Sequence, residues 1–189
     1  VCDEGALAVR VATAAAQIDW PRDKLRIQVL DDGRTADHEA LANTIRSAVP
    51  EGTPIDILHR GDRTGFKAGN LAFGLQHSEA PYVAIFDADF VPPSDFLRRT
   101  IPPLVADPGL AFMQARWGHA NRCKNWLTRM QGVLLDAHFA VEQEGRVRAG
   151  IPISFNGTAG VWRREAIDNG GGWTGDTLTE DLDLSMRCA

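Results

Sequence analysis

The stretch Tyr82-Val83-Ala84-Ile85-Phe86-Asp87-Ala88-Asp89 decides the fold class. Its first five residues form a continuous apolar run, which is typical of a strand covered on both faces of a sheet. Two aspartates follow directly, where such a strand ends. Because ligands of open α/β sheets bind beyond the carboxyl ends of the strands, Asp87 and Asp89 are the first candidate site residues.

Apolar periodicity and turn residues divide the rest of the chain into alternating elements. Before this stretch we predict helices over 5–18, 35–49 and 66–77 and strands over 25–30 and 55–59. After it we predict helices over 94–101, 119–146 and 178–187, a strand over 110–114 and an extended segment over 151–163. This alternation predicts an α/β fold with a mostly parallel central sheet flanked by helices.

Composition limits the classes of function. The 189 residues are enough for one domain, 1–189, and the net charge of −5 argues against broad nucleic-acid binding. Cys2, Cys123 and Cys188 lie far apart, so we expect neither disulfides nor a zinc knuckle, and a reducing cytosol is the natural setting. The histidines lack H-x-x-x-H spacing, which makes a zinc site improbable. No apolar run reaches the roughly 20 residues of a membrane span.

Asp87 and Asp89 are two hard oxygen ligands at one strand terminus, which suits Mg²⁺ or Mn²⁺ bound to a diphosphate. Helix capping or solvation is the alternative. Asp31 and Asp32 end an earlier strand, where they either form a turn or hold the base or ribose of a nucleotide. Lys67 follows a glycine loop at a helix start and either pairs with a phosphate or is solvated.

A second acidic cluster, Thr179-Glu180-Asp181, lies at the start of the last predicted helix. It either caps that helix, with Thr179 as the cap, or supplies Asp181 as a general base that deprotonates a hydroxyl. Phe155 to Gly160 contains small residues that let backbone approach a ligand, with a tight hairpin as the alternative.

Together these motifs resemble the inverting family-two glycosyltransferases with a GT-A fold, most closely the cellulose-synthase-like enzymes such as the β-mannan and glucomannan synthases. The order of the motifs carries the resemblance: Cys2-Asp3-Glu4, Asp31-Asp32-Gly33, 65–70, Asp87-Ala88-Asp89, 114–119, 155–162, Gly171-Gly172-Trp173 and 177–185.

The resemblance implies a role for each matching residue. Glu4, Asp31, Asp32 and Lys67 would hold the nucleotide diphosphate. Asp87 would contact the donor, and Asp89 the metal. Asp181 would be the base for a single displacement that inverts the anomeric carbon. Glu180 and the loop Asn156-Gly157-Thr158 would lie on the acceptor side. The donor would be a nucleotide-diphosphate sugar such as UDP-glucose or GDP-mannose, and the acceptor a growing β-glycan.

The chain also departs from the family pattern. The Q-x-x-R-W motif of processive members would lie beyond Ala189, and a first apolar strand would precede Val1. We therefore expect a piece truncated at both ends that folds poorly alone, from a membrane-associated protein whose catalytic domain faces the cytosol and whose flanking helices are absent here. Alternatives are non-processive transfer to a lipid or small acceptor, and an inactive sugar-nucleotide-binding module.

Overall fold

The computed structural model describes residues 1–2 and 4–189; Asp3, part of the first motif, lies outside them. The helices are α1 Gly5–Ala16, α2 Thr35–Ala48, α3 Phe66–Gln76, α4 Phe96–Ala106, α5 Trp126–Ala137, α6 Glu144–Arg148, α7 Arg164–Asn169 and α8 Glu180–Arg187, with a 3-10 turn at Arg22–Lys24 and a π-helix at His138–Gln143. The strands are β1 Ile27–Asp31, β2 Ile55–His59, β3 Tyr82–Ile85, β4 Phe112–Gln114 and β5 Gly160–Arg163.

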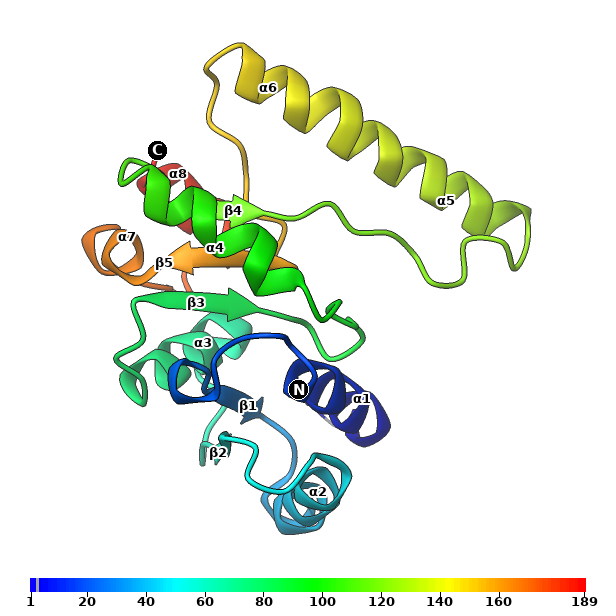
Figure 1. The fold of residues 1–189 in the computed structure, drawn as a ribbon, viewed down its shortest axis with the longest axis vertical. Coiled ribbons are helices and arrows are strands. Elements are labelled where there is room, and N and C mark those ends of the chain that lie inside the picture. The colour runs from blue at the N-terminus through cyan, green and yellow to red at the C-terminus, as the bar shows by residue number, and fades with distance from the viewer. Residues whose placement is uncertain (3) are drawn as a thin grey trace.

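Strand pairing gives two small sheets rather than one continuous sheet. β1 and β2 pair in parallel, with Ile27 opposite Ile55 and Asp31 opposite His59. β5 lies between β3 and β4 and runs antiparallel to both. Figure 1 shows β1, β3 and β4 pointing one way and β5 the other. The strands are therefore mostly parallel in direction, as expected, but the hydrogen-bonded pairs of β5 are antiparallel.

Apolar packing joins the two sheets although no described strand pairs across them. One core cluster contains Ile27 of β1, Val161 of β5, alanines of α1 and Phe96, Leu97, Ile101 and Leu104 of α4. The alanine-rich face of α1 buries Ala8, Ala12, Ala15 and Ala16, and its small side chains let the helix backbone lie close to the strands. Val1 lies beside the end of β1, where its amino group donates to the Leu30 carbonyl at 2.7 Å. Whether the chain folds alone stays a prediction.

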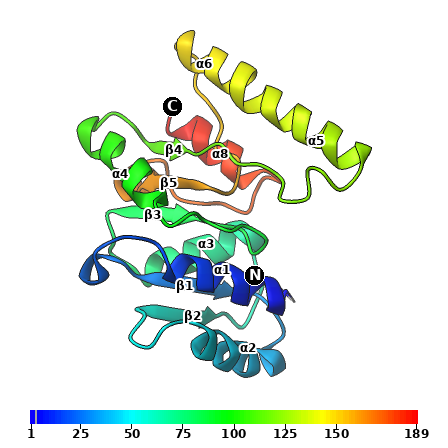
Figure 2. The same cartoon turned by 45° about the vertical axis from the view of Figure 1, so that its right-hand side comes forward.

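The helix predicted over 119–146 begins later than expected, at Trp126, where Asn125 and Thr128 form a capping box. It continues through the π-helix into α6, and this arm stands away from the sheets in both views (Figures 1 and 2). In the part of the chain that the structure describes, no helix combines the length and apolar character needed to cross a bilayer.

Candidate active site

The carboxyl end of β1 forms the floor of a cavity of about 410 Å³. Asp31, only 2% exposed, accepts a hydrogen bond from the Gly33 N–H at 2.8 Å. Its other carboxylate oxygen lies 2.8 Å from His38 Nδ1 and 3.7 Å from His59 Nδ1. The cavity is lined by Glu4, Gly5, Asp31, Gly33, Arg34, Asp37 and Leu41. Glu4 and Asp31, predicted to hold the nucleotide, therefore share one cavity.

Asp31, His38 and His59 offer three ligand atoms within 4.8 Å of one another, so they could hold a metal ion. The two imidazole rings stack with centroids 4.7 Å apart. His59 Nδ1 also lies 3.1 Å from the Asp31 carbonyl oxygen, an acceptor, so this nitrogen carries a proton and donates. His38 pairs with the Asp31 carboxylate and His59 with the Asp31 carbonyl, so the cluster can hold Asp31 in place or, when both Nδ1 atoms are unprotonated, offer ligands to a metal ion.

Sequence reasoning missed this cluster because its histidines are 21 positions apart in sequence. The register of the parallel pair brings Asp31 beside His59, and the first turn of α2 brings His38 over both. The only sequence signal was that two neighbouring strands end in an acid and a histidine.

Asp32 is engaged by an arginine. Its carboxylate, 7% exposed, accepts two hydrogen bonds from Arg60, at 2.6 and 2.7 Å. Arg60 also donates to the carbonyls of Thr64 and Phe66 at 2.7 Å. The hydrogen bonds to Asp32 raise the pKa of Arg60 above its usual value, so the pair stays charged. Asp32 thus shapes the loop that leads to Lys67, rather than presenting a free carboxylate.

Lys67 connects three of the predicted site segments. Its ammonium donates to the Asp87 carboxylate at 2.7 Å and to the Gly157 carbonyl at 2.9 Å. A Cβ built on Gly157 would lie 3.2 Å from Lys67 Nζ and 3.0 Å from Asp181 Oδ2. The cation, the base candidate and one metal-ligand candidate therefore meet around Gly157, although they come from α3, α8 and the end of β3.

Unfavourable backbone conformations flank this meeting point. Phe66 and Ala159 are the two non-glycine residues with positive φ, 47° and 57°, within the described ranges. Gly65, directly before Phe66, and Gly157, two positions before Ala159, have φ of 71° and 75°. Such conformations persist only where surrounding contacts enforce them, and they concentrate at functional sites.

The loop over 155–158 is held from both sides. The Ser185 hydroxyl donates to the Asp181 carbonyl at 2.6 Å and accepts from the Phe155 N–H at 2.8 Å. The Asp87 N–H donates to Thr158 Oγ1 at 2.9 Å. These contacts bind the start of α8 and the end of β3 to one rigid loop.

In the loop predicted to lie near the acceptor, Asn156 donates its N–H to Gln114 Oε1 at 2.8 Å, and its side-chain amide lies 3.0 Å from His138 Nε2. Glu180 is half-buried and begins α8 beside Asp181. Thr179 precedes the helix but makes no side-chain cap bond, so the predicted capping by its hydroxyl is wrong.

Asp89 is an exposed residue, whereas Asp87 is half-buried and pairs its carboxylate with Lys67. Its main-chain carbonyl accepts from Arg10 Nη2 at 2.7 Å, which fixes the turn after β3. The exposed oxygens of Asp89, beside Asp87, have the chemistry that Mg²⁺ or Mn²⁺ prefers.

The fold is that of the GT-A glycosyltransferases, and solved structures of that class share it. A mannosyltransferase, PcManGT from Pyrobaculum calidifontis, in complex with GDP-Man and Mn²⁺, superimposes with a TM-score of 0.76 at 21% identity, covering 100% of this chain and 50% of that one. TarS from S. aureus in complex with UDP superimposes with a TM-score of 0.66 at 13% identity, over 100% of this chain and 52% of that one.

The chain belongs to Glycosyl transferase family 2, whose sequence profile matches residues 2–170. It is 44% identical over 180 residues to probable glucomannan 4-beta-mannosyltransferase 7 of Oryza sativa subsp. japonica, covering 93% of this chain and 31% of that protein. It is 43% identical over 178 residues to glucomannan 4-beta-mannosyltransferase 7 of Arabidopsis thaliana, covering 92% and 32%. The chain thus spans about a third of the length of these relatives. The expected family, fold and enzyme class are confirmed.

Proposed function

We propose that this chain is the catalytic region of an inverting hexosyltransferase that moves a sugar from a nucleoside diphosphate onto a growing β-glycan. The observation that carries the proposal is the meeting of Lys67, Asp87 and Asp181 around Gly157. A cation for the diphosphate and a carboxylate for the acceptor hydroxyl lie on the same side of one glycine, where no side chain separates them.

Each group has one task in this proposal. Lys67 binds the leaving diphosphate, and its ammonium gives up its contact with the Asp87 carboxylate to do so. Asp181 accepts the proton of the acceptor hydroxyl as that oxygen attacks the anomeric carbon from the face opposite the diphosphate. One such displacement turns an α-linked donor into a β-linked product. The Leu182 N–H donates to the Asp181 carboxylate at 2.9 Å and the Ser185 hydroxyl donates to the Asp181 carbonyl, and together they hold Asp181 in place.

Asp89 and Asp87 would hold the divalent cation. Such an ion, when bound, neutralises charge that develops on the departing diphosphate. The solved mannosyltransferase structure with GDP-Man and Mn²⁺ supports a divalent metal in this fold. We propose Asp89 rather than the Asp31–His38–His59 cluster as its site, because the Asp31 carboxylate already lies 2.8 Å from His38 Nδ1 and accepts the Gly33 N–H.

For the donor, we propose GDP-mannose ahead of UDP-glucose, because the similar plant proteins are named mannosyltransferases. The cavity above Asp31, with Glu4 and Arg34 in its lining, would take the nucleotide base. We further propose that the complete protein is membrane-associated, with this region facing the cytosol, as for a synthase that extends a polymer.

The test is radiolabelled sugar transfer by membranes that contain the complete protein, with Mn²⁺ or Mg²⁺ and either donor. Asp181→Asn is the test variant. Asp183→Asn is its matched control, since Asp183 lies on the same helix but pairs with Arg187. We expect metal-dependent, digestible polymer from wild type and from the control, and none from Asp181→Asn. Labelled lipid or short product would favour non-processive transfer, and binding without transfer would favour a binding module. If the Asp181→Asn variant makes as much polymer as wild type, Asp181 is not the base.

A further inference from the structure

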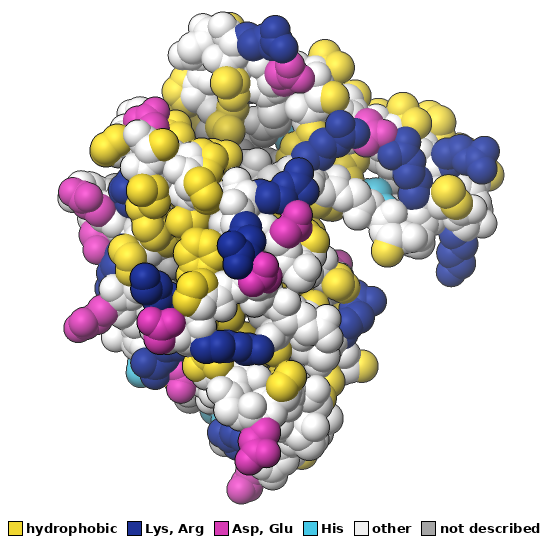
Figure 3. Space-filling view, viewed as in Figure 1, with side chains coloured by type: hydrophobic (Ala, Val, Ile, Leu, Met, Phe, Trp, Pro, Cys, Tyr) yellow, Lys and Arg dark blue, Asp and Glu magenta, His cyan; other side chains and the backbone are white. Residues whose placement is uncertain are grey.

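The outer face of the α5–α6 arm carries a stripe of apolar side chains that nothing in the described chain covers. The side chains are 49% to 76% exposed. The residues of this outer stripe are Trp126, Leu127, Met130, Val133, Leu134 and Val141. Spacings of three, four and seven positions place them on one side of the helix. Figure 3 shows hydrophobic side chains along the outer edge of the arm and basic side chains near its end.

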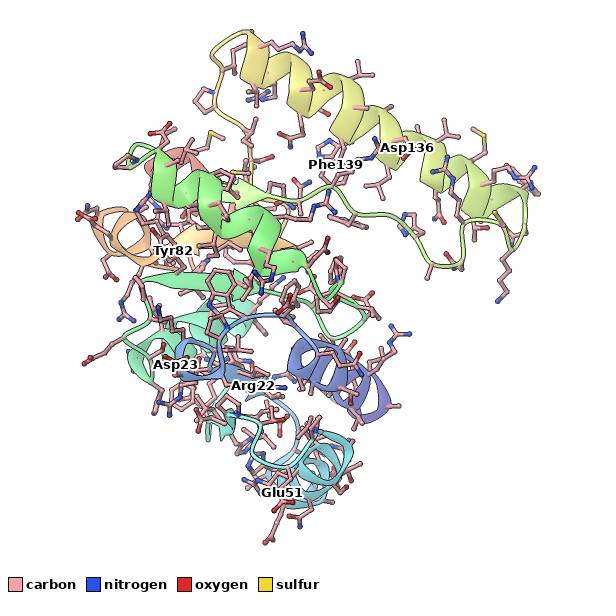
Figure 4. The ribbon with its side chains drawn as sticks, in the orientation of Figure 1. Arg22, Asp23, Glu51, Tyr82, Asp136 and Phe139 are labelled. Carbon is pink, nitrogen blue, oxygen red and sulfur yellow. The ribbon has the colours of Figure 1, made fainter. Side chains whose placement is uncertain are left out.

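The arm buries a different face. Gly132 and Phe139 are buried, and the Phe139 ring lies 5.9 Å from that of Trp117. Figure 4 shows Phe139 on the side of the arm that faces the sheet. The helix is therefore apolar on two opposite faces, and only one of them is explained by packing within the fold. A second, exposed apolar face on a helix marks a surface that contacts another protein or a membrane.

Charge indicates what covers the stripe. Residues 116–148 contain six Lys or Arg and three Asp or Glu, a net of +3 in a chain whose net charge is −5. Asp136 is paired with both Arg116 and Arg122, whose hydrogen bonds hold the pKa of its carboxyl below the usual value.

The two other acids of the arm are also paired, Glu142 with His138 and Glu144 with Arg148. Lys124 and Arg129, beside Trp126, form no ion pair with any described residue. The end of the arm is thus cationic as well as apolar.

We infer that the outer stripe docks on an anionic lipid surface, with Trp126 and its neighbours entering the headgroup region and Lys124 and Arg129 contacting lipid phosphates. Exposed Trp and Leu next to Lys and Arg are the composition of interfacial helices. A second copy would bring the same cations against each other, whereas anionic headgroups complement them. This inference rests on the membrane association proposed above and names the surface responsible.

The first experiment is flotation of the purified protein with vesicles of phosphatidylcholine, with or without phosphatidylserine. Trp126→Ser with Leu134→Ser removes apolar contact, and Lys124→Gln with Arg129→Gln removes charge. Val105→Ser is the control, since Val105 is 60% exposed on α4. All these side chains are exposed, so the substitutions leave the core intact.

We expect binding to the anionic vesicles only, unchanged in the control. The apolar double variant should bind at least about ten-fold more weakly. Each neutralised cation should weaken binding by about five-fold. Equal binding by all variants, or none by wild type, would overturn the inference. So would a dimer that the apolar variant converts to a monomer.

A second measurement separates this surface from membrane association itself. The same variants are placed in the complete protein, and its distribution between membrane and soluble fractions is followed at high salt. A change in tryptophan fluorescence that the wild-type protein shows with anionic vesicles, and the variant with Trp126→Ser lacks, supports docking. If the complete protein stays on membranes while no variant affects vesicle binding or this fluorescence change, the association stands and the assignment of the arm is wrong.

Discussion

Gly157 is the position where one added methyl group tests the geometry of the site. Its φ is 75°, and a Cβ there would lie 3.0 Å from Asp181 Oδ2 and 3.2 Å from Lys67 Nζ. Gly157→Ala therefore has two effects. The left-handed backbone costs an alanine about 1–2 kcal/mol of stability. The methyl group also pushes the Asp181 carboxylate away from its position.

The size of the catalytic effect follows from the contact distance. Ordinary van der Waals contacts of a Cβ begin at 3.4 Å, so the carboxylate must move by a few tenths of an ångström. Since a misplacement of about 1 Å can cost about a hundred-fold in rate, we expect transfer to fall roughly ten-fold at saturating donor. Donor affinity should change less, because the Asp31 cavity is untouched and the flexible end of the Lys67 side chain can move away from the methyl group.

Gly52→Ala is the matched control. Gly52 has the same φ of 75°, and nothing lies within 4 Å of the place that a Cβ would take, so the substitution carries the backbone cost alone. Urea unfolding of both variants measures that shared loss, and initial rates of sugar transfer measure the difference between them. If Gly157→Ala transfers sugar as fast as Gly52→Ala, the proposed arrangement of Lys67 and Asp181 around Gly157 is wrong.

Three further predictions concern stability and thiol chemistry. Arg60→Met should destabilise the fold by about 3–5 kcal/mol in urea unfolding, because it leaves the buried Asp32 carboxylate unpaired; a change under about 1 kcal/mol would contradict this. Ser185→Ala should cost about 1–3 kcal/mol and slow transfer, because the Phe155 N–H loses its acceptor, and a fully stable variant would argue against that bridge. Burial raises the pKa of the Cys188 thiol, so less of it is thiolate and it should react with Ellman's reagent more slowly than a free thiol does. Cys188→Ser should therefore remove a slow phase of labelling and leave the fast phase unchanged.

The strand–helix order could be predicted from sequence because it depends on local patterns. The apolar run 82–86 is a strand in its own right, and β3 begins at its first residue. The direction of β5 could not be predicted, because the segment over 151–163 contains no signal for its partners, and only its antiparallel pairing between β3 and β4 decides its direction. The late start of α5 depends on the capping box at Asn125. The boundary could not be predicted from apolar periodicity, because that pattern contains no information on polar capping contacts.

The chemistry of the site was predicted in part. Asp87 was singled out by its place after a predicted strand, and Lys67 and Asp181 by their places at the starts of predicted helices; their assigned roles stay predictions. Asp32 shows the limit of this reasoning: the sequence did not reveal that Arg60, 28 positions later, donates two hydrogen bonds to its carboxylate, and its role in holding the nucleotide stays a prediction.

The sequence by itself determined the α/β class, the family and the set of acidic and basic residues from which the site is built, because periodicity and motif order are local properties of a chain. Only the tertiary structure decided that Lys67 and Asp181 face the same side of Gly157, that two histidines hold Asp31, and that the arm is apolar on its outer face. The physical reason is that these features depend on strand register, on left-handed backbone at single residues and on which helix face finds a partner. Each of them is settled by contacts between residues far apart in sequence.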